Sequence, residues 1–109
     1  MSHQKNASCI EACYACATAC NHCAAACLRE PDVTAVARCI ANDMDCAAIC
    51  ALAAGAMARG SEEVTAICKL CADACTRCAQ ECSKHMMDHC QACAAACRRC
   101  VDECRSMSS

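Results

Sequence analysis

Residues 9–27 read CIEACYACATACNHCAAAC, and cysteine recurs in this stretch at alternating intervals of four and three residues. Side chains spaced in this way lie on one face of an α-helix, which turns once in about 3.6 residues. The cysteines on this face are Cys9, Cys13, Cys16, Cys20, Cys23 and Cys27. The stretch therefore predicts an α-helix with one face lined by thiols.

The same spacing returns in the rest of the chain, twice in full and once in a sparser form. The further stripes are Cys68, Cys71, Cys75, Cys78 and Cys82; Cys90, Cys93, Cys97, Cys100 and Cys104; and the sparser Cys39, Cys46 and Cys50. Each stripe is a heptad seam in which cysteine takes the positions that Leu or Ile usually occupies. The pattern predicts four helices that direct their thiols toward one another.

The composition favours helices and excludes an ordinary apolar core. The chain has 109 residues, which suits one domain over 1–109, and it contains 19 cysteines, one tyrosine, and neither Phe nor Trp. Only two glycines and one proline are present to interrupt helices, and alanine, the strongest helix former, is abundant. We therefore expect an all-α fold.

Local signals suggest where the helices begin and end. Ser8 and Glu11 have the spacing of a capping box, Pro31 suits the first turn of a second helix, and Gly60 suits its end. These signals predict helices at about 8–29, 32–59, 62–85 and 87–105. Because the connections are short, successive helices must be antiparallel neighbours. The prediction is an up-down-up-down antiparallel four-helix bundle with a cysteine-lined lumen.

This topology gives the two ends of the bundle different character. His22, His85, Met86 and His89 are expected at one end, which we call the mouth. Met57, Val64 and Met107 are expected at the other end. Imidazole and thioether groups are ligands for soft metals, so His85 and His89 become candidate metal ligands beside the thiols. The seam of the second helix also contains Asp43, which we expect at the wet end of the lumen because a buried carboxylate is costly.

Charge and targeting signals limit the possible partners and the compartment. The formal net charge is −2 and the sequence pI is about 6.0, so the chain lacks the basic surface that nucleic-acid binding requires. The N-terminus shows no export signal, and the longest uncharged stretch, 12–28, is too short and too polar for a membrane span. We expect a cytoplasmic protein whose thiols stay reduced rather than paired in disulfides.

Thiolates are soft ligands that select Cu(I), Zn(II) or Fe–S clusters. Four Zn(II) sites of four unshared thiolates each would place a charge of about −8 in an interior without buried cations. A Cu⁺ ion that displaces one thiol proton leaves the interior charge unchanged. Eight CxxxC pairs repeat in phase along the chain. The pattern thus favours storage of many Cu(I) ions, about one per cysteine, or ~15–20 per chain.

Other functions remain open at this point. A metallothionein-like buffer for Zn(II) or Cd(II) would use the same thiols, and competitive titration with Cu(I) and Zn(II) would separate the two. An Fe–S or dithiol redox protein is less well supported, since CxxC pairs such as Cys13/Cys16 and Cys75/Cys78 lack the βαβ context or the Cys-Pro of such proteins. No nucleophile with an oriented base and no phosphate loop is recognisable, so we do not expect an enzyme.

Over nearly its whole length the chain resembles the four-helix-bundle copper storage proteins, particularly their cytosolic branch. The resemblance lies in Ser8-Cys-Ile-Glu-Ala-Cys13, Asn21-His-Cys23, Cys46-Ala-Ala-Ile-Cys-Ala-Leu-Ala53, Lys84-His85, His89-Cys-Gln-Ala-Cys93 and Cys104-Arg-Ser-Met107. It implies cytosolic storage and buffering of Cu(I) on the thiolates from Cys9 to Cys104, with copper detoxification as a consequence. It also implies entrance ligands at His85 and His89 and a homotetramer, but names no donor or acceptor of copper.

The chain departs from the family pattern at two places. The second helix offers only three thiols and has Asp43, Ala53 and Met57 at other seam positions, so that wall of the lumen is less complete. The signal peptide of the exported branch is missing, and so is a Met-rich entrance on the second helix.

Overall fold

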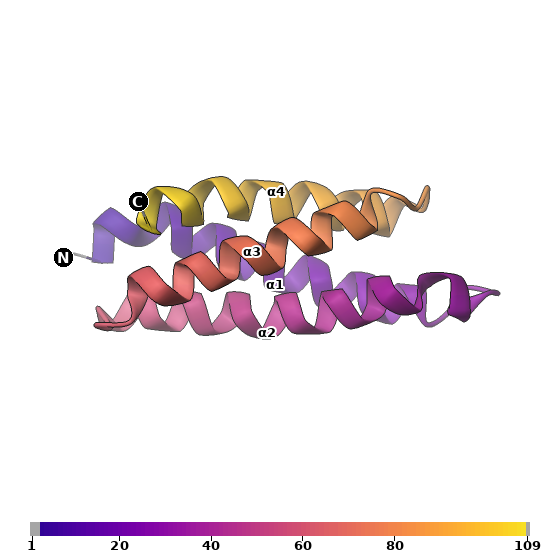
Figure 1. Ribbon diagram of the computed structural model, residues 1–109, viewed down its shortest axis with the longest axis horizontal. Coiled ribbons are helices and arrows are strands. Elements are labelled where there is room, and N and C mark those ends of the chain that lie inside the picture. The colour runs from indigo at the N-terminus through magenta and orange to yellow at the C-terminus, as the bar shows by residue number, and fades with distance from the viewer. Residues whose placement is uncertain (1–2, 109) are drawn as a thin grey trace.

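Four long helices make up the computed structural model, which describes residues 3–108, with side chains described for 6–107 (Figure 1). The helices are α1 (His3–Cys27), α2 (Ala37–Arg59), α3 (Val64–Cys82) and α4 (Asp88–Ser108), and a short 3-10 helix, η1 (Val33–Val36), precedes α2. No strand occurs among the described residues. The all-α prediction is confirmed.

Each helix runs antiparallel to its neighbours in the sequence. Helix α1 packs against α2 and α4, and α3 packs against the same two helices. The bundle is elongated, 47 × 19 × 18 Å, and the start of α1 and the end of α4 lie at the left in Figure 1, with the α1–α2 and α3–α4 connections at the right. This is the predicted up-down-up-down bundle.

The predicted capping box at Ser8 is wrong, because α1 already includes His3 and Ser8 lies inside the helix. The Ser8 hydroxyl donates a hydrogen bond to Glu103 of α4 at 2.8 Å rather than to its own backbone. The heptad seam continues before Cys9, so packing against α4 extends the helix past the local start signal. The helix also ends at Cys27, two residues before the predicted end.

The start of the second helix differs from the prediction as well. Pro31 lies before the 3-10 turn η1 rather than in the first turn of α2. The Asp32 side chain accepts a hydrogen bond from the Ala35 backbone N–H at 3.3 Å and caps this turn. At the other end, Gly60 adopts the left-handed conformation, with φ 66°, and its N–H bonds to the last turn of α2. The predicted end of the second helix is therefore confirmed.

The third helix is shorter than predicted and the fourth is longer. Helix α3 spans Val64–Cys82, and α4 spans Asp88–Ser108, against predicted ranges of 62–85 and 87–105. His85 and Met86 consequently lie in the α3–α4 connection. Met86 is 86% exposed, so the prediction that its side chain faces the mouth is wrong: the backbone leaves the helix before the seam reaches it.

The segment Val33–Arg59 is long and apolar enough to span a membrane by length and composition, with a mean hydropathy of 1.3. In the bundle, 44% of its most apolar window is buried against the other helices. The core helix of a soluble protein passes the same test, because its apolar side chains face neighbouring helices.

Candidate metal centre

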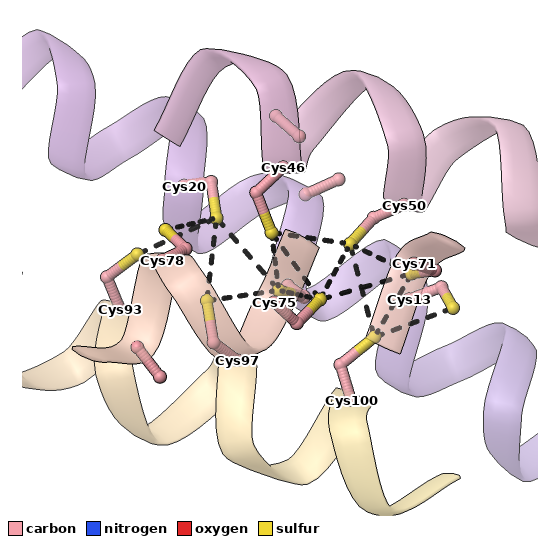
Figure 2. Packing of buried hydrophobic residues seen from close by; sticks show 14 of the residues in the cluster. Cys13, Cys20, Cys46, Cys50, Cys71, Cys75, Cys78, Cys93, Cys97 and Cys100 are labelled. Atoms are coloured by element: carbon pink, nitrogen blue, oxygen red, sulfur yellow. Dashed lines mark hydrogen bonds between the residues drawn. The ribbon is translucent and has the colours of Figure 1, made fainter. Parts of the chain in front are cut away.

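All nineteen cysteines lie in the interior of the bundle as free thiols. Cys9 is 2% exposed and every other cysteine is 0% exposed. Figure 2 shows the central part of this column, where the labelled sulfur atoms of all four helices point toward one another. The helical spacing read from the sequence therefore produces a continuous column of sulfur along the bundle axis.

The antiparallel register stacks the thiols in layers. Between α2 and α3, the Sγ–Sγ distances are 3.2 Å for Cys39–Cys82, 3.4 Å for Cys46–Cys75 and 3.6 Å for Cys50–Cys71. Between α1 and α4, they are 3.8 Å for Cys9–Cys104 and 3.6 Å for Cys13–Cys100, Cys16–Cys97 and Cys20–Cys93. Thiols four residues apart on one helix, such as Cys46 and Cys50, are 3.9 Å apart. Each thiol layer is thus in contact with the next.

The layers form groups of four thiols whose sulfur atoms all lie within 4.8 Å of one another. These groups include Cys13/Cys71/Cys100/Cys104, Cys16/Cys46/Cys50/Cys75, Cys16/Cys20/Cys46/Cys97, Cys20/Cys78/Cys93/Cys97 and Cys23/Cys27/Cys39/Cys90. With metal–sulfur bonds of about 2.3 Å, three- and four-coordinate ions need sulfur atoms ~3.8–4.0 Å apart, whereas a linear ion needs ~4.6 Å. The observed spacing therefore suits ions held by three or four thiolates.

Several thiols belong to two of these groups, as Cys16 and Cys20 do. A shared thiolate bridges two metal ions, so neighbouring sites form one cluster rather than separate centres. No Lys or Arg side chain is buried among the described residues, where the buried polar residues are Asn6, Asp43 and Glu81. The interior can therefore accept metal only if each ion's charge is matched by released protons.

Asp43 lies inside the thiol column, where it is 0% exposed. Its Oδ1 accepts hydrogen bonds from the thiols of Cys78, Cys93 and Cys82 at 3.1, 3.3 and 3.4 Å, and its Oδ2 accepts one from Cys39 at 3.8 Å. Burial raises the pKa of Asp43 to about 10, so the carboxyl group is neutral at pH 7. The expectation that Asp43 lies at the wet end of the lumen is wrong. Protonation and four thiol donors let the group stay in the interior.

Hydrogen bonds between neighbouring thiols shift their pKa values in opposite directions. The pKa of Cys39 is lowered, because Cys23 and Cys82 donate hydrogen bonds that stabilise its thiolate. The pKa of Cys20 rises, chiefly because its thiol donates to Cys16 and Cys46 and because it is buried. The thiols therefore share protons along the column, and ionisation is a property of the coupled group rather than of any single cysteine.

Two histidines lie near the thiols at the end where α1 joins α2 and α3 joins α4. The His85 Nε2 is 3.0 Å from the Glu81 carboxylate, which also lies 3.3 Å from Lys84 Nζ and 3.7 Å from Arg38 Nε. This hydrogen bond with His85 lowers the pKa of Glu81. The contact also leaves Nδ1 as the nitrogen of His85 that is available to a metal.

His89 lies in the first turn of α4, one residue before Cys90. Its side chain is 15% exposed, and its buried Nε2 has no hydrogen-bond partner, the Glu30 carboxylate being 3.6 Å away. By contrast, His22 is exposed and lines a groove on the outer face of α1 with Tyr14. The structure therefore brings His85 and His89 to the mouth but leaves His22 outside the lumen.

The opposite end is largely apolar, as predicted. Met57 is 1% exposed, and Val64 and Met107 pack against the buried thiol cluster. One residue of this end was not predicted: Asn6, which is 2% exposed. It lies three residues before Cys9, so extending the α1 seam by one turn could have identified it.

Comparison with known proteins agrees with this geometry. The sequence model of the family described as copper storage protein matches residues 2–109. Among curated proteins, an uncharacterized cysteine-rich protein of Bacillus subtilis (strain 168), YhjQ, is 51% identical over 106 residues, which are 97% of this chain and 98% of that protein.

Solved structures are similar over the whole bundle. The Cu(I)-bound copper storage protein BsCsp3 is 49% identical, with a TM-score of 0.92 over 99% of this chain and 100% of that one. A cytosolic copper storage protein from Streptomyces lividans, in a structure described as holding five coppers, is 40% identical, with a TM-score of 0.93 over 97% of this chain and 93% of that one. Sequence, fold and thiol column together show that this chain belongs to the copper storage protein family.

Proposed function

We propose that this protein stores and buffers Cu(I) in the cytosol, on the thiolates of its nineteen cysteines, and that sequestration protects the cell from free copper. The single observation that carries this proposal is the column of buried free thiols arranged in groups that share members. Bridging thiolates let one sulfur serve two or more ions, so many ions can be held per chain, and replacement of one proton by one Cu⁺ keeps the interior neutral. The expected capacity is about one Cu(I) per cysteine.

The same geometry gives less support to Zn(II). Four-thiolate zinc sites carry a charge of −2 each, and no buried Lys or Arg among the described residues offsets it. Asp43 does not change this balance, because its buried carboxyl group is neutral at pH 7. A Zn(II) buffer would therefore accumulate negative charge as it filled, whereas a Cu(I) store would not. The protein acts as a binder of copper and not as an enzyme.

The test is an anaerobic titration of the reduced apoprotein with Cu(I), followed by gel filtration and metal analysis. We expect retention of about one Cu(I) per cysteine in the presence of a competing Cu(I) chelator. A parallel titration with Zn(II) should retain fewer ions. Preferential retention of Zn(II), at about one ion per four cysteines, would refute the copper assignment.

Copper is proposed to enter at the end that holds His85 and His89. Each histidine has its Nε2 close to a glutamate, at 3.0 Å for His85 and Glu81 and at 3.6 Å for His89 and Glu30. These carboxylates attract a cation, and the imidazoles can hold it before it passes to the thiols. The double variant His85→Ala/His89→Ala should load more slowly than the unaltered protein, and His22→Ala is the matched control. Equal loading rates of the two variants would contradict this path.

We also propose that the protein assembles into a homotetramer through the outer faces of its helices. Tyr14 on α1 and Met44 and Leu52 on α2 are 53%, 61% and 47% exposed, which leaves apolar side chains available for another copy. A Tyr14→Asp variant should shift the protein to a smaller species in light scattering coupled to gel filtration. A protein that is already monomeric without substitution would refute the proposal.

A further inference from the structure

Glu81 is a buried carboxylate at the mouth of the bundle. It lies in the last turn of α3, beside the lumen cysteine Cys82, and its side chain is 10% exposed. Burial of an ionised carboxylate is costly unless its oxygens are paired. The sequence gave no role to this residue, because it falls one position off the thiol seam. Its contacts show what compensates for the burial.

The two oxygens of Glu81 have different partners. Oε1 lies 3.3 Å from Lys84 Nζ and 3.7 Å from Arg38 Nε, whereas Oε2 lies 3.0 Å from His85 Nε2. Two cationic side chains keep the carboxylate ionised, and an ionised carboxylate can only accept a hydrogen bond. His85 must therefore donate through its Nε2–H. In the neutral imidazole this places the proton on Nε2 and leaves a lone pair on Nδ1.

The backbone of His85 is fixed as well. Its N–H donates to the Cys82 carbonyl oxygen at 3.1 Å, which ties it to the end of α3. From α4, the Gln91 Nε2 donates to the His85 carbonyl oxygen at 2.6 Å. The residue lies in the connection between these helices, yet both helices hold it. The orientation of the ring is therefore set before any metal ion arrives.

The Nδ1 of His85 is the open nitrogen of this ring. Among the described residues, the buried side-chain N and O atoms without a hydrogen-bond partner are Asn6 Oδ1 and His89 Nε2, so the unpaired Nδ1 of His85 is not a buried atom. His89 differs from His85, because the Glu30 carboxylate is 3.6 Å from its Nε2, too far for a hydrogen bond. Of these two histidines, His85 is the one that a carboxylate orients.

We propose that Glu81 is a positioning residue of the copper entrance, which holds His85 so that an incoming Cu(I) ion binds at Nδ1. The inference rests on the proposed function. A carboxylate that accepts from the far nitrogen of a metal-binding imidazole fixes its tautomer and makes it a stronger donor. Glu81 itself is not the ligand, because carboxylate oxygen is a hard donor and its two oxygens already contact Lys84, Arg38 and His85.

Binding at Nδ1 suits an entrance, where the ion is held only briefly. The lone pair of Nδ1 forms the Cu–N bond, and Nε2 keeps its proton toward Glu81, so no proton is released at this step. When the ion moves on, the Cu–N bond breaks, a Cu–S bond to a lumen cysteine forms, and the thiol proton passes to the solvent. The ring of His85 is then left in the tautomer that receives the next ion.

The first experiment reads the tautomer directly, by long-range ¹H–¹⁵N NMR of the full chain with ¹⁵N-labelled histidine. The reduced protein is kept anaerobic at about pH 8, above the reference imidazole pKa of about 6.5. His85 should show a protonated Nε2 and an unprotonated Nδ1, and added Cu(I) should shift the Nδ1 resonance. His85→Ala assigns the signals. Glu81→Gln should remove the preference for this tautomer, because its NH₂ group can donate to Nε2, whereas the control Glu30→Gln should not.

The outcomes of this titration separate the two proposals. A protein that retains no Cu(I) would refute the proposed function itself. A protein that fills its thiol sites would refute only the role of Glu81 if His85 carries its proton on Nδ1, if Cu(I) shifts Nε2 as the bonded nitrogen, or if neither nitrogen of His85 responds.

The second experiment measures the rate of anaerobic Cu(I) transfer from a weak Cu(I) chelator to the reduced protein. Loss of the partner that orients a metal-binding imidazole typically costs about tenfold or more, so Glu81→Gln should load about tenfold more slowly. Glu30→Gln removes the same charge from the mouth without removing such a hydrogen bond, and it should slow loading less. Both variants should reach the unaltered final capacity, and far-UV circular dichroism verifies their fold. Equal slowing of the two variants, or loading of Glu81→Gln at the unaltered rate, would overturn the positioning role.

Discussion

Asp43→Asn should stabilise the apoprotein at neutral pH. Asp43 is 0% exposed, no buried Lys or Arg lies among the described residues, and the contacts of its carboxyl group are thiol donors. These surroundings raise its pKa to about 10, chiefly through burial. The folded protein therefore keeps this carboxyl group protonated at a pH where the unfolded chain ionises it. Asparagine has nearly the same shape and carries no charge to bury.

The magnitude follows from the linkage between pKa and stability. A carboxyl group with a raised folded pKa contributes its full stability below its unfolded pKa of about 3.9 and loses it as the pH rises toward the folded value. Each pH unit in this window costs about 1.4 kcal/mol, so the loss reaches about 4 kcal/mol at pH 7. The asparagine variant avoids this loss, and its amide oxygen can still accept from the thiols. Because its NH₂ group meets only weak sulfur acceptors, about 4 kcal/mol is the upper limit of the gain.

The assay is anaerobic guanidinium unfolding of the reduced apoprotein, followed by far-UV circular dichroism between pH 5 and 7.5, below the range in which unfolded cysteines ionise. We expect the free energy of unfolding of the unaltered protein to fall with pH relative to that of Asp43→Asn, by about 1.4 kcal/mol per unit. Asp45→Asn, on the exposed side of α2, is the matched control and should leave the slope unchanged. Parallel pH profiles for the unaltered protein and Asp43→Asn would refute the reasoning.

Three further predictions concern capacity, backbone geometry and the mouth. Cys75 lies 3.4 Å from Cys46, so Cys75→Ser should lower the Cu(I) capacity in the anaerobic titration by about one ion, and an unchanged capacity would mean that the thiol is not a ligand. Gly60→Ala should cost about 1 kcal/mol of unfolding free energy in guanidinium, because φ is 66° there; no loss would contradict the left-handed end of α2. Glu81→Gln should destabilise the protein at pH 7, because His85 lowers the pKa of Glu81; the difference should begin to shrink near the unfolded pKa of about 4.3 and vanish only once the pH is below the lowered folded pKa. A difference that does not shrink as the pH is lowered from 5 through this range in the same unfolding assay would show that charge is not the cause.

The thiol column was predictable because its signal is regular and long. Alternating intervals of three and four residues recur over four segments, and only helices facing one another can bury such stripes. The seam position of Asp43 was predictable for the same reason. Its burial was not, since a carboxylate in a thiol lumen is costly until Cys78, Cys82 and Cys93 are placed around it as donors.

The helix ends were predicted less well, because local signals compete there with packing. Ser8 and Glu11 match a capping box, yet Ser8 contacts Glu103 from α4 and the helix continues toward the N-terminus. Met86 continues a seam only if α3 continues, and the chain leaves the helix after Cys82 instead. In both cases the position of the helix end is decided by a contact or a turn between helices, which a short stretch of sequence does not reveal.

The sequence by itself determined that four helices would turn their thiols inward and that soft metal ions, with Cu(I) foremost, would be the cargo, because periodicity and ligand chemistry are properties of single segments. Only the tertiary structure decided which thiols form shared groups, that Asp43 is buried as a neutral acid, and that Glu81 contacts the ring of His85 at the mouth. These features depend on the register between helices, and that register is set by the packing of the whole bundle rather than by any one helix.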